Sequence, residues 1–235
     1  MTLNEIMSEL KSLGNENIKK ILLKHGVKEP FFGVKIENLK PIQKKIKKDY
    51  KLSNELYFTN NADAMYLAGL IADDEKMTKK DLQAWVKLAV SANINGFTVP
   101  WVTAGSKHGF ELAMEWIDSK EEHIAVAGWS TLSGLVAIKP DSELDLNIIK
   151  SLIDRVVKNI HTSKNNERKT MNGFIIAVGT YVKALTKDSI SAANKIGSIS
   201  IDMNGTACKI PDAAEYIKKA ADKKLIGNKK KTLKC

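Results

Sequence analysis

The sequence lacks the residues and segments that would assign it to several large classes of protein. Of its 235 residues only two are cysteines, Cys208 and Cys235, which are too few for a framework of disulfide bridges. Its four histidines are scattered without the spacing of a zinc site, so we expect no bound metal and no cofactor. No apolar run reaches about eighteen residues, and the N-terminal residues predict an amphipathic helix and not a signal peptide. We therefore expect a reduced, cytoplasmic protein without a membrane partner.

Acidic residues are also in deficit, which makes charge the most informative part of the composition. The chain has 37 Lys and Arg against 27 Asp and Glu, a formal net charge of +10. Such an excess favours a polyanionic partner. Part of it lies in residues 223–235, a basic C-terminal tail that is either a solvated terminus or a binding segment. The lysines of this tail are Lys223, Lys224, Lys229, Lys230, Lys231 and Lys234.

Residues 38–51 are predicted to form one helix with a lysine-rich face. Asn38 is its expected N-cap, Pro41 falls in its first turn, and Leu39 and Ile42 begin its buried stripe. This face contacts either phosphate groups or only water, and the pattern fits both. Four lysines lie on it at the spacing i, i+4, i+7 and i+11, about one helical turn apart: Lys40, Lys44, Lys47 and Lys51.

Helical periodicity recurs along the whole chain, whereas strand patterns are nearly absent. Thr2 with Glu5 and Thr78 with Asp81 have the spacing of capping boxes. We count about ten to twelve helices, with helix pairs at intervals of about forty residues, which is typical of HEAT-type solenoids. The predicted fold is therefore all-α, a right-handed superhelical stack of HEAT-like helix pairs in one domain over residues 1–235. An irregular helical bundle is the alternative.

The segment GSISIDMNGTACKIP departs from this helical pattern. Ile199, Ile201 and Met203 alternate with polar residues, and a turn is expected at Asn204-Gly205. The segment predicts a short extended arm or a hairpin-like loop. We assign no chemistry to residues 202–211.

Several residues are candidates for contact with a polyanionic partner. Trp101 follows a proline and is expected either in the core or on the concave surface, and Lys107 and His108 stand at a helix start where they either touch a phosphate or only begin the helix. Arg168 and Lys169 are predicted in a polar loop that leads into a helix, where a guanidinium group and a helix N-terminus both favour phosphate.

Other conspicuous residues are expected to have structural roles. Trp116 and Trp129 lie on apolar helix faces and are predicted in the core. Arg155, the only other arginine, is predicted to be a solvated residue in the middle of a helix. Cys208 is more typical of a small buried residue than of a nucleophile, because no histidine is near it in sequence.

Four stretches of the chain carry a resemblance to the DNA alkylation repair family, the AlkD-like proteins, and the similarity extends over nearly the whole sequence. They are DAMYLAGLIADDEKMTKKDLQAWVKLAV, VPWVTAGSKHGFELAMEWI, MNGFIIAVGTYVKAL and DMNGTACKIPDAAEYIKKA. The last two, together with the KKKTLKC end, are similar to a widespread bacterial branch of that family. The resemblance implies an all-α superhelix of HEAT-like repeats. The best-known members are DNA glycosylases that excise alkylated purines, although a fold alone does not imply an activity.

The resemblance also shows where this sequence departs from the active members. They carry a tryptophan followed four residues later by an aspartate, in a stretch of the form WWDxxD. Trp101 matches the tryptophan, but Gly105 stands where the aspartate is expected, and no acid lies between Phe97 and Lys107. The family's carboxylate is therefore missing around Trp101.

Two further matches fail in the same way. The second active-site tryptophan of the family, in a stretch resembling AIGW, falls on Thr180, and its paired arginines fall near Val126 and Ala127. We therefore predict that this chain has no catalytic residue of the family and does not excise alkylated bases.

Three functions remain open, and in each the protein is expected to be a monomer. The first is a DNA-binding protein without glycosylase activity that contacts the backbone of duplex, damaged or branched DNA through a basic concave face. The second is a glycosylase of N3- and N7-alkylated purines whose acid is relocated, with Asp63, Glu111 or Asp202 as candidates. The third is a scaffold for protein interaction. A steep salt dependence of DNA binding separates the first two from the third.

Overall fold

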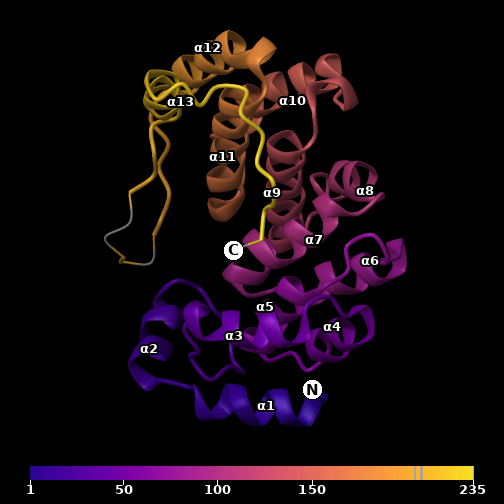
Figure 1. The fold of residues 1–235 in the computed structure, drawn as a ribbon. Helices are drawn as coiled ribbons and strands as arrows, with labels where there is room; N and C mark the ends of the chain where they lie inside the picture. The colour runs from indigo at the N-terminus through magenta and orange to yellow at the C-terminus, as the bar shows by residue number, and fades with distance from the viewer. Residues whose placement is uncertain (204, 207–208, 235) are drawn as a thin grey trace. The chain divides into compact units, whose positions relative to one another are not determined.

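The computed structural model describes residues 1–203, 205–206 and 209–234, and all the regular structure in these ranges is helical. Thirteen α-helices, two 3₁₀ turns and one π-helical turn follow one another along the described chain (Figure 1). No described residue lies in a strand, which confirms the all-α prediction. None of the described helices is long and apolar enough to cross a membrane.

The chain divides into two compact units, which are described separately. The first comprises residues 1–112, 205–206 and Lys234, and the second comprises residues 113–203 and 209–233 of the described chain. The helices that begin in the first unit are α1 (Leu3–Ser12), α2 (Glu16–Lys24), α3 (Ile36–Ile46), α4 (Tyr50–Tyr57), α5 (Ala62–Ile71), α6 (Lys79–Leu88), the π turn η1 (Ile94–Thr98), α7 (Val99–Gly105) and α8 (Gly109–Trp116).

Helix α5 is the centre of the first unit. All ten of its residues are buried, because its sequence ADAMYLAGLI is apolar around nearly the whole circumference. It packs against α1, α3, α4, α7 and η1. Gly69 makes the closest of these approaches possible, since a Cβ atom at this position would lie 2.5 Å from Cγ2 of Thr98 in η1.

A ring stack joins α4 to α6 at the edge of this core. The rings of Tyr57 and Trp85 are parallel within 3° with centroids 3.9 Å apart, and both side chains are fully buried. The hydroxyl of Tyr57 donates to the carbonyl of Trp85 at 2.7 Å, and the indole of Trp85 donates to Oδ1 of Asn54 at 3.0 Å. The polar atoms of the stack are therefore satisfied although they are buried.

The second unit is built around a pair of long helices, α9 and α11. The buried rings of Trp129 and Phe174 meet between them at 5.4 Å. Trp116 is buried as well, and so the predicted core positions of Trp116 and Trp129 are confirmed. The elements of this unit are α9 (Glu122–Ile138), the 3₁₀ turn η2 (Asp141–Glu143), α10 (Leu146–Asn159), α11 (Asn165–Tyr181), the 3₁₀ turn η3 (Lys183–Leu185), α12 (Thr186–Ile196) and α13 (Ala213–Asp222).

The two predicted capping boxes are confirmed. Thr2 and Glu5 cap α1, and Thr78 and Asp81 cap α6, each with both reciprocal hydrogen bonds. A capping box can be predicted from the sequence because both of its residues lie within one helical turn of each other.

The prediction of one helix over residues 38–51 is wrong. Helix α3 begins after Lys35 and not after Asn38, so Pro41 lies in its interior. The chain leaves the helical conformation at Lys47, where φ is 65°. A new helix, α4, begins because the carboxylate of Asp49 accepts the amide of Leu52 at 2.9 Å and caps it.

The boundary of α11 also differs from the prediction. The prediction of a polar loop at Arg168 and Lys169 is wrong, because the helix begins at Asn165 and contains both residues. The first turn is stabilised by a distant acid, since Oε1 of Glu122 accepts the amide of Asn166 at 2.7 Å. A cap supplied from 44 residues away leaves no local pattern in the sequence.

Candidate nucleic-acid interface

Trp101 lies in the core of the first unit and not on an open surface. Its side chain is 8% exposed, and its ring meets the edge of the Tyr66 ring at 5.4 Å. Outside it lies Phe97, whose ring centroid is 5.8 Å away and whose side chain is 53% exposed. The aromatic residue that this part of the unit presents to solvent is therefore Phe97, which sequence analysis did not select.

Position 105, at the end of α7, lies against a carboxylate from another segment. A Cβ atom on Gly105 would lie 2.5 Å from Oδ2 of Asp74 and 3.0 Å from its Cγ. A side chain at this position would therefore have to displace the Asp74 carboxylate. Asp74 places a carboxylate beside the position where the family resemblance implies one, and no local signal in the sequence pointed to it.

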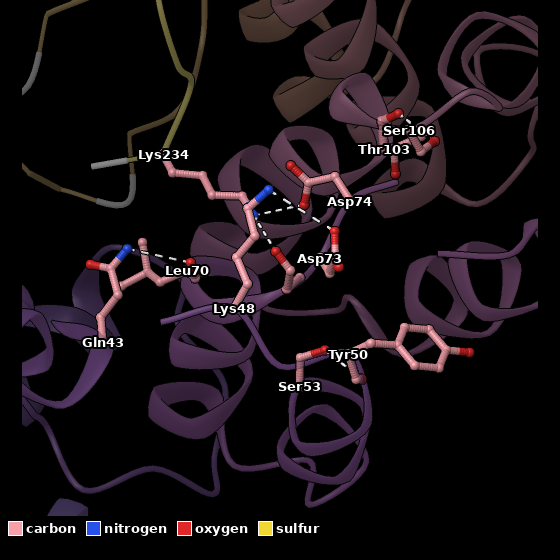
Figure 2. Close-up of polar contacts among 11 residues, drawn as sticks. Gln43, Lys48, Tyr50, Ser53, Leu70, Asp73, Asp74, Thr103, Ser106 and Lys234 are labelled. Atoms are coloured by element: carbon pink, nitrogen blue, oxygen red, sulfur yellow. Dashed lines mark hydrogen bonds and ion pairs between the residues drawn. The ribbon is translucent and has the colours of Figure 1, made fainter. Parts of the chain in front are cut away.

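Asp74 is paired with the penultimate residue of the chain, which the first unit also contains. Nζ of Lys234 lies 2.6 Å from Oδ1 of Asp74, and the two side chains are 14% and 20% exposed (Figure 2). Burial raises the pKa of Asp74, and the ammonium of Lys234 acts in the opposite direction. Burial likewise lowers the pKa of Lys234, against the effect of Asp74. The negative charge of Asp74 is therefore balanced by the ammonium of Lys234.

Lys234 also completes the C-terminal end of α5. Its Nζ donates to the carbonyl of Ala72 at 2.9 Å, and the amide of Asp49 donates to the carbonyl of Ile71 at 2.9 Å. Nε2 of Gln43 donates to the carbonyl of Leu70 at 3.3 Å (Figure 2). The last carbonyls of a helix have no partner within it, and a cation there interacts favourably with the helix dipole. The tail residue thus caps the central helix of the unit.

The three acids considered as relocated catalysts have other surroundings. Asp63 is buried, and its carboxylate accepts the amides of residues 32, 33 and 34 at 2.6 to 3.3 Å. Burial raises its pKa more than these hydrogen bonds lower it. Glu111 is exposed and pairs with Lys79 at 2.6 Å, which lowers its pKa. Asp202 is exposed, and its backbone is held by Asn165.

The predicted lysine face is divided between two helices and a turn. Lys40 and Lys44 are exposed on α3, Lys47 is exposed in the turn that ends it, and none of the three pairs with another residue of the described chain. Lys51 lies on α4, 3.8 Å from the carboxylate of Glu55. The side chains of the first three lysines are therefore accessible to a partner.

The connection between α7 and α8 carries the next two candidates. Lys107 is exposed, and His108 is half-buried with its backbone amide bound to Oγ of Ser106 at 3.2 Å. Because Lys107 stands beside this fixed turn, its ammonium extends from a well-defined backbone.

Both arginines of the chain are engaged inside the second unit. Arg168 donates from Nε to the carbonyl of Ser163 and from Nη1 to that of Ser200, each at 2.8 Å. Arg155 pairs with Asp118 at 2.7 Å and lies 5.7 Å from the ring centroid of Trp129, so the prediction that it is a solvated residue is wrong. Lys169, next to Arg168, is exposed.

The non-helical segment between α12 and α13 is attached to α11 at three places. Arg168 holds Ser200, Asn165 exchanges two hydrogen bonds with the backbone of Asp202, and Nδ2 of Asn172 donates to the carbonyl of Pro211 at 3.0 Å. The described residues of the segment form no strand, and Gly205 lies in a turn at the place where one was expected. Cys208 lies outside the described residues.

The part of the basic tail that belongs to the second unit packs against the ends of two helices. The amide of Gly227 donates to Thr180 and that of Lys230 to Ala137, each at 2.8 Å. Nζ of Lys229 lies 2.7 Å from Asp141 and donates to Val136 at 2.9 Å. These carbonyls belong to the last turns of α9 and α11. Part of the tail's charge is thus used within the protein.

Thr180 and the residues at the other family positions are buried. Thr180 is 6% exposed, and Val126 and Ala127 are 4% and 0% exposed. Neither a stacking tryptophan nor a pair of exposed arginines is present at these places.

The protein is therefore all-α in its described residues. Several of its lysines are exposed, its two arginines are bound within the second unit, and position 105 is a glycine. Residues 6–217 match the family described as DNA alkylation repair enzyme. The chain belongs to this DNA alkylation repair family.

Similar proteins agree with this assignment. Uncharacterized proteins of Listeria innocua and of Listeria monocytogenes are each 31% identical over 229 residues, which cover 95% of this chain and 99% of the relative. A solved structure with a TM-score of 0.92 and 32% identity covers both chains completely. It is described as belonging to a new family of proteins related to the HEAT-like repeat DNA glycosylases with affinity for branched DNA structures. The predicted HEAT-like fold class is confirmed.

Proposed function

We propose that this protein binds branched DNA by contacting the phosphate backbone of the DNA and by recognising the shape of the branch. We further propose that it does not excise bases. The proposal follows the branched-DNA affinity of the structurally similar protein and the net charge of +10. The observation that carries it is a difference between the arginines and the lysines in what their side chains contact. Both arginines are half-buried and bound to groups of the second unit, whereas Lys40, Lys44 and Lys47 are exposed and unpaired within the described chain.

This division determines the kind of recognition. Arginine forms bidentate contacts with the edge of guanine and is the commonest reader of sequence, whereas lysine acts on phosphate as a compact point charge. Phosphate contacts position a protein on DNA without specifying a sequence. We therefore assign phosphate contacts to Lys107 and Lys169 as well as to the three lysines of the first unit. In this proposal Lys51 and His108 have secondary roles, and Trp101 and Arg168 act by supporting their neighbours.

A gel-shift titration tests the function itself. The protein is titrated against a four-way junction, a nicked duplex and a continuous duplex of the same sequence, at two salt concentrations. We expect tighter binding to the junction, no dependence on base sequence and a steep loss of affinity with salt. Equal affinity for junction and duplex contradicts the preference for branched DNA. Binding that salt does not weaken contradicts the phosphate contacts and favours a scaffold for protein interaction.

Replacing Lys40 and Lys44 by alanine is expected to weaken binding to every DNA alike. Each lost phosphate contact lowers the steepness of the plot of log affinity against log salt by about 0.9, so the double variant should reduce the slope by up to about two units. A control of equal charge change is Lys139→Ala with Lys150→Ala, because both lysines already pair with acids, Glu143 and Asp188. A slope that falls equally in the two variants shows that only net charge matters.

One observation favours a second candidate, base excision by a relocated acid. Asp74 brings a carboxylate against Gly105, four residues after Trp101. Its pairing with Lys234 opposes this role, because a carboxylate already bound to an ammonium stabilises a developing cation less. Release of methylated bases, considered in the Discussion, separates the two candidates.

A further inference from the structure

Phe97 stands on an unusual turn of the backbone. Residues Ile94–Thr98 form a π-helical turn, in which the amide of Val99 reaches back to the carbonyl of Ile94. The following Pro100 has no amide for the carbonyl of Gly96 and its ring crowds that carbonyl, which favours the wider turn. Turns of this kind are rare and frequent at functional sites.

The ring of Phe97 is supported from inside and open on the outside. It lies at 46° to the ring of Trp101, which is itself held by the edge of Tyr66. Trp101 and Tyr66 are 8% and 5% exposed, whereas Phe97 is 53% exposed. A Cβ atom on the neighbouring Gly96 would meet no atom within 4 Å, so the turn itself is open at that position. Because about half of the Phe97 side chain is exposed, a flat ligand can reach its ring.

This combination separates Phe97 from the other exposed phenylalanines. Phe110 on α8 is 45% exposed and has no ring contact within the described chain. Phe58 is 48% exposed and meets the neighbouring Tyr57 ring at 6.3 Å, and that ring in turn stacks on Trp85. Phe58 thus also has two rings behind it, but it follows the end of the regular helix α4 and does not stand on a π-helical turn. Single exposed apolar residues are common on protein surfaces. An exposed, ring-supported side chain on a rare backbone turn is what separates Phe97 from them.

We propose that Phe97 stacks on a base exposed at the branch point of DNA and supplies the preference for branched over continuous DNA. The inference rests on the proposed function and adds the contact that distinguishes the two DNA forms. Bases inside a duplex are stacked on both faces, while a base at a branch loses a neighbour and offers one face to an aromatic side chain. Stacking of this kind does not depend on base identity, because every base has a flat face.

The contact has a signature that differs from that of the lysines. A phenyl ring carries no charge and releases no counterions from DNA. Loss of Phe97 should therefore lower the affinity for branched DNA without changing its salt slope, and should leave duplex binding unchanged. Loss of one base–aromatic stack typically lowers affinity by about five- to 150-fold.

The experiment compares the full-length protein with Phe97→Ala, Phe97→Leu, Phe97→Trp and the control Phe110→Ala. Each is titrated against a four-way junction and a matched duplex at two salt concentrations, with 2-aminopurine at the branch as a fluorescent report of stacking. We expect Phe97→Ala and Phe97→Leu to lose junction affinity and the fluorescence change, and Phe97→Trp to retain both. Phe110→Ala should behave like the parent protein. Unchanged duplex affinity shows that the variants are folded.

Three outcomes overturn the inference. In the first, Phe97→Ala keeps the parent's preference for the junction, which removes Phe97 and leaves the proposed function intact. In the second, Phe97→Ala weakens binding to duplex and junction equally, which assigns it a structural role. In the third, the parent protein itself shows no preference for the junction, which removes the proposed function and the inference with it.

Discussion

Purified protein incubated with DNA that carries N3- or N7-methylpurines is expected to release free base no faster than the DNA alone. Breaking the N-glycosidic bond builds positive charge on the sugar, and a carboxylate fixed nearby stabilises that transition state. Position 105 carries no side chain, and the Asp74 carboxylate packed against it is bound to the ammonium of Lys234 at 2.6 Å. Loss of one preorganised electrostatic group typically costs about 10²–10³ in rate.

Introducing the family's acid by Gly105→Asp is expected not to create the activity. The new Cβ atom would collide with Asp74, at 2.5 Å from its Oδ2, and the two carboxylates would repel each other. Overpacking of this kind typically destabilises a protein by about 1–3 kcal/mol. Base release is measured by chromatography, and stability by thermal unfolding.

Gly96→Asp is the matched control for this variant. It makes the same chemical change in the same unit, but a Cβ atom there meets nothing within 4 Å, so its stability should be close to that of the parent. Release of methylated base well above the protein-free level, abolished by Asp74→Asn, would falsify the non-catalytic proposal and establish Asp74 as a relocated acid.

The second large effect is expected from Asp74→Ala. This change leaves the ammonium of Lys234 buried beside the Ala72 carbonyl without its counter-ion. Breaking one partner of a buried ion pair typically costs about 3–5 kcal/mol, and the residual exposure of 14% and 20% places our expectation at the lower end of that range. Unfolding by urea, followed by circular dichroism, measures the loss.

A double-mutant cycle shows whether the pair is the cause. Lys234→Ala also removes the cap from α5, and the double variant with Asp74→Ala should lose clearly less stability than the two single losses added together. Lys231→Ala, a change at an exposed tail lysine, serves as the control and should be neutral. Strict additivity would mean that the two side chains do not interact energetically, and the ion pair would then contribute nothing.

Sequence reasoning was accurate where the signal and its partner lie within one turn of each other. Both capping boxes formed as predicted, and Trp116 and Trp129 are buried on the apolar faces that their periodicity indicated. It failed where a competing local signal was overlooked. Asp49 begins a second helix, and so the lysines from Lys40 to Lys51 do not share one helix face.

The candidate site was harder to predict because its members come together only in three dimensions. Asp74 and Lys234 are 160 residues apart and form an ion pair that no spacing rule describes. Arg168 was selected for its charge, but the tertiary structure uses that charge on two backbone carbonyls. Whether a basic side chain is available to a ligand depends on which acceptors folding brings beside it.

The sequence by itself determined the helical class, the family and the glycine at position 105, because periodicity, local caps and residue identity are properties of neighbouring positions. Only the tertiary structure decided which side chains are free. It buried Trp101, exposed Phe97, engaged both arginines and placed Asp74 against position 105. The physical reason is that burial and pairing depend on distances between segments far apart in the chain, which packing of the whole core fixes at once.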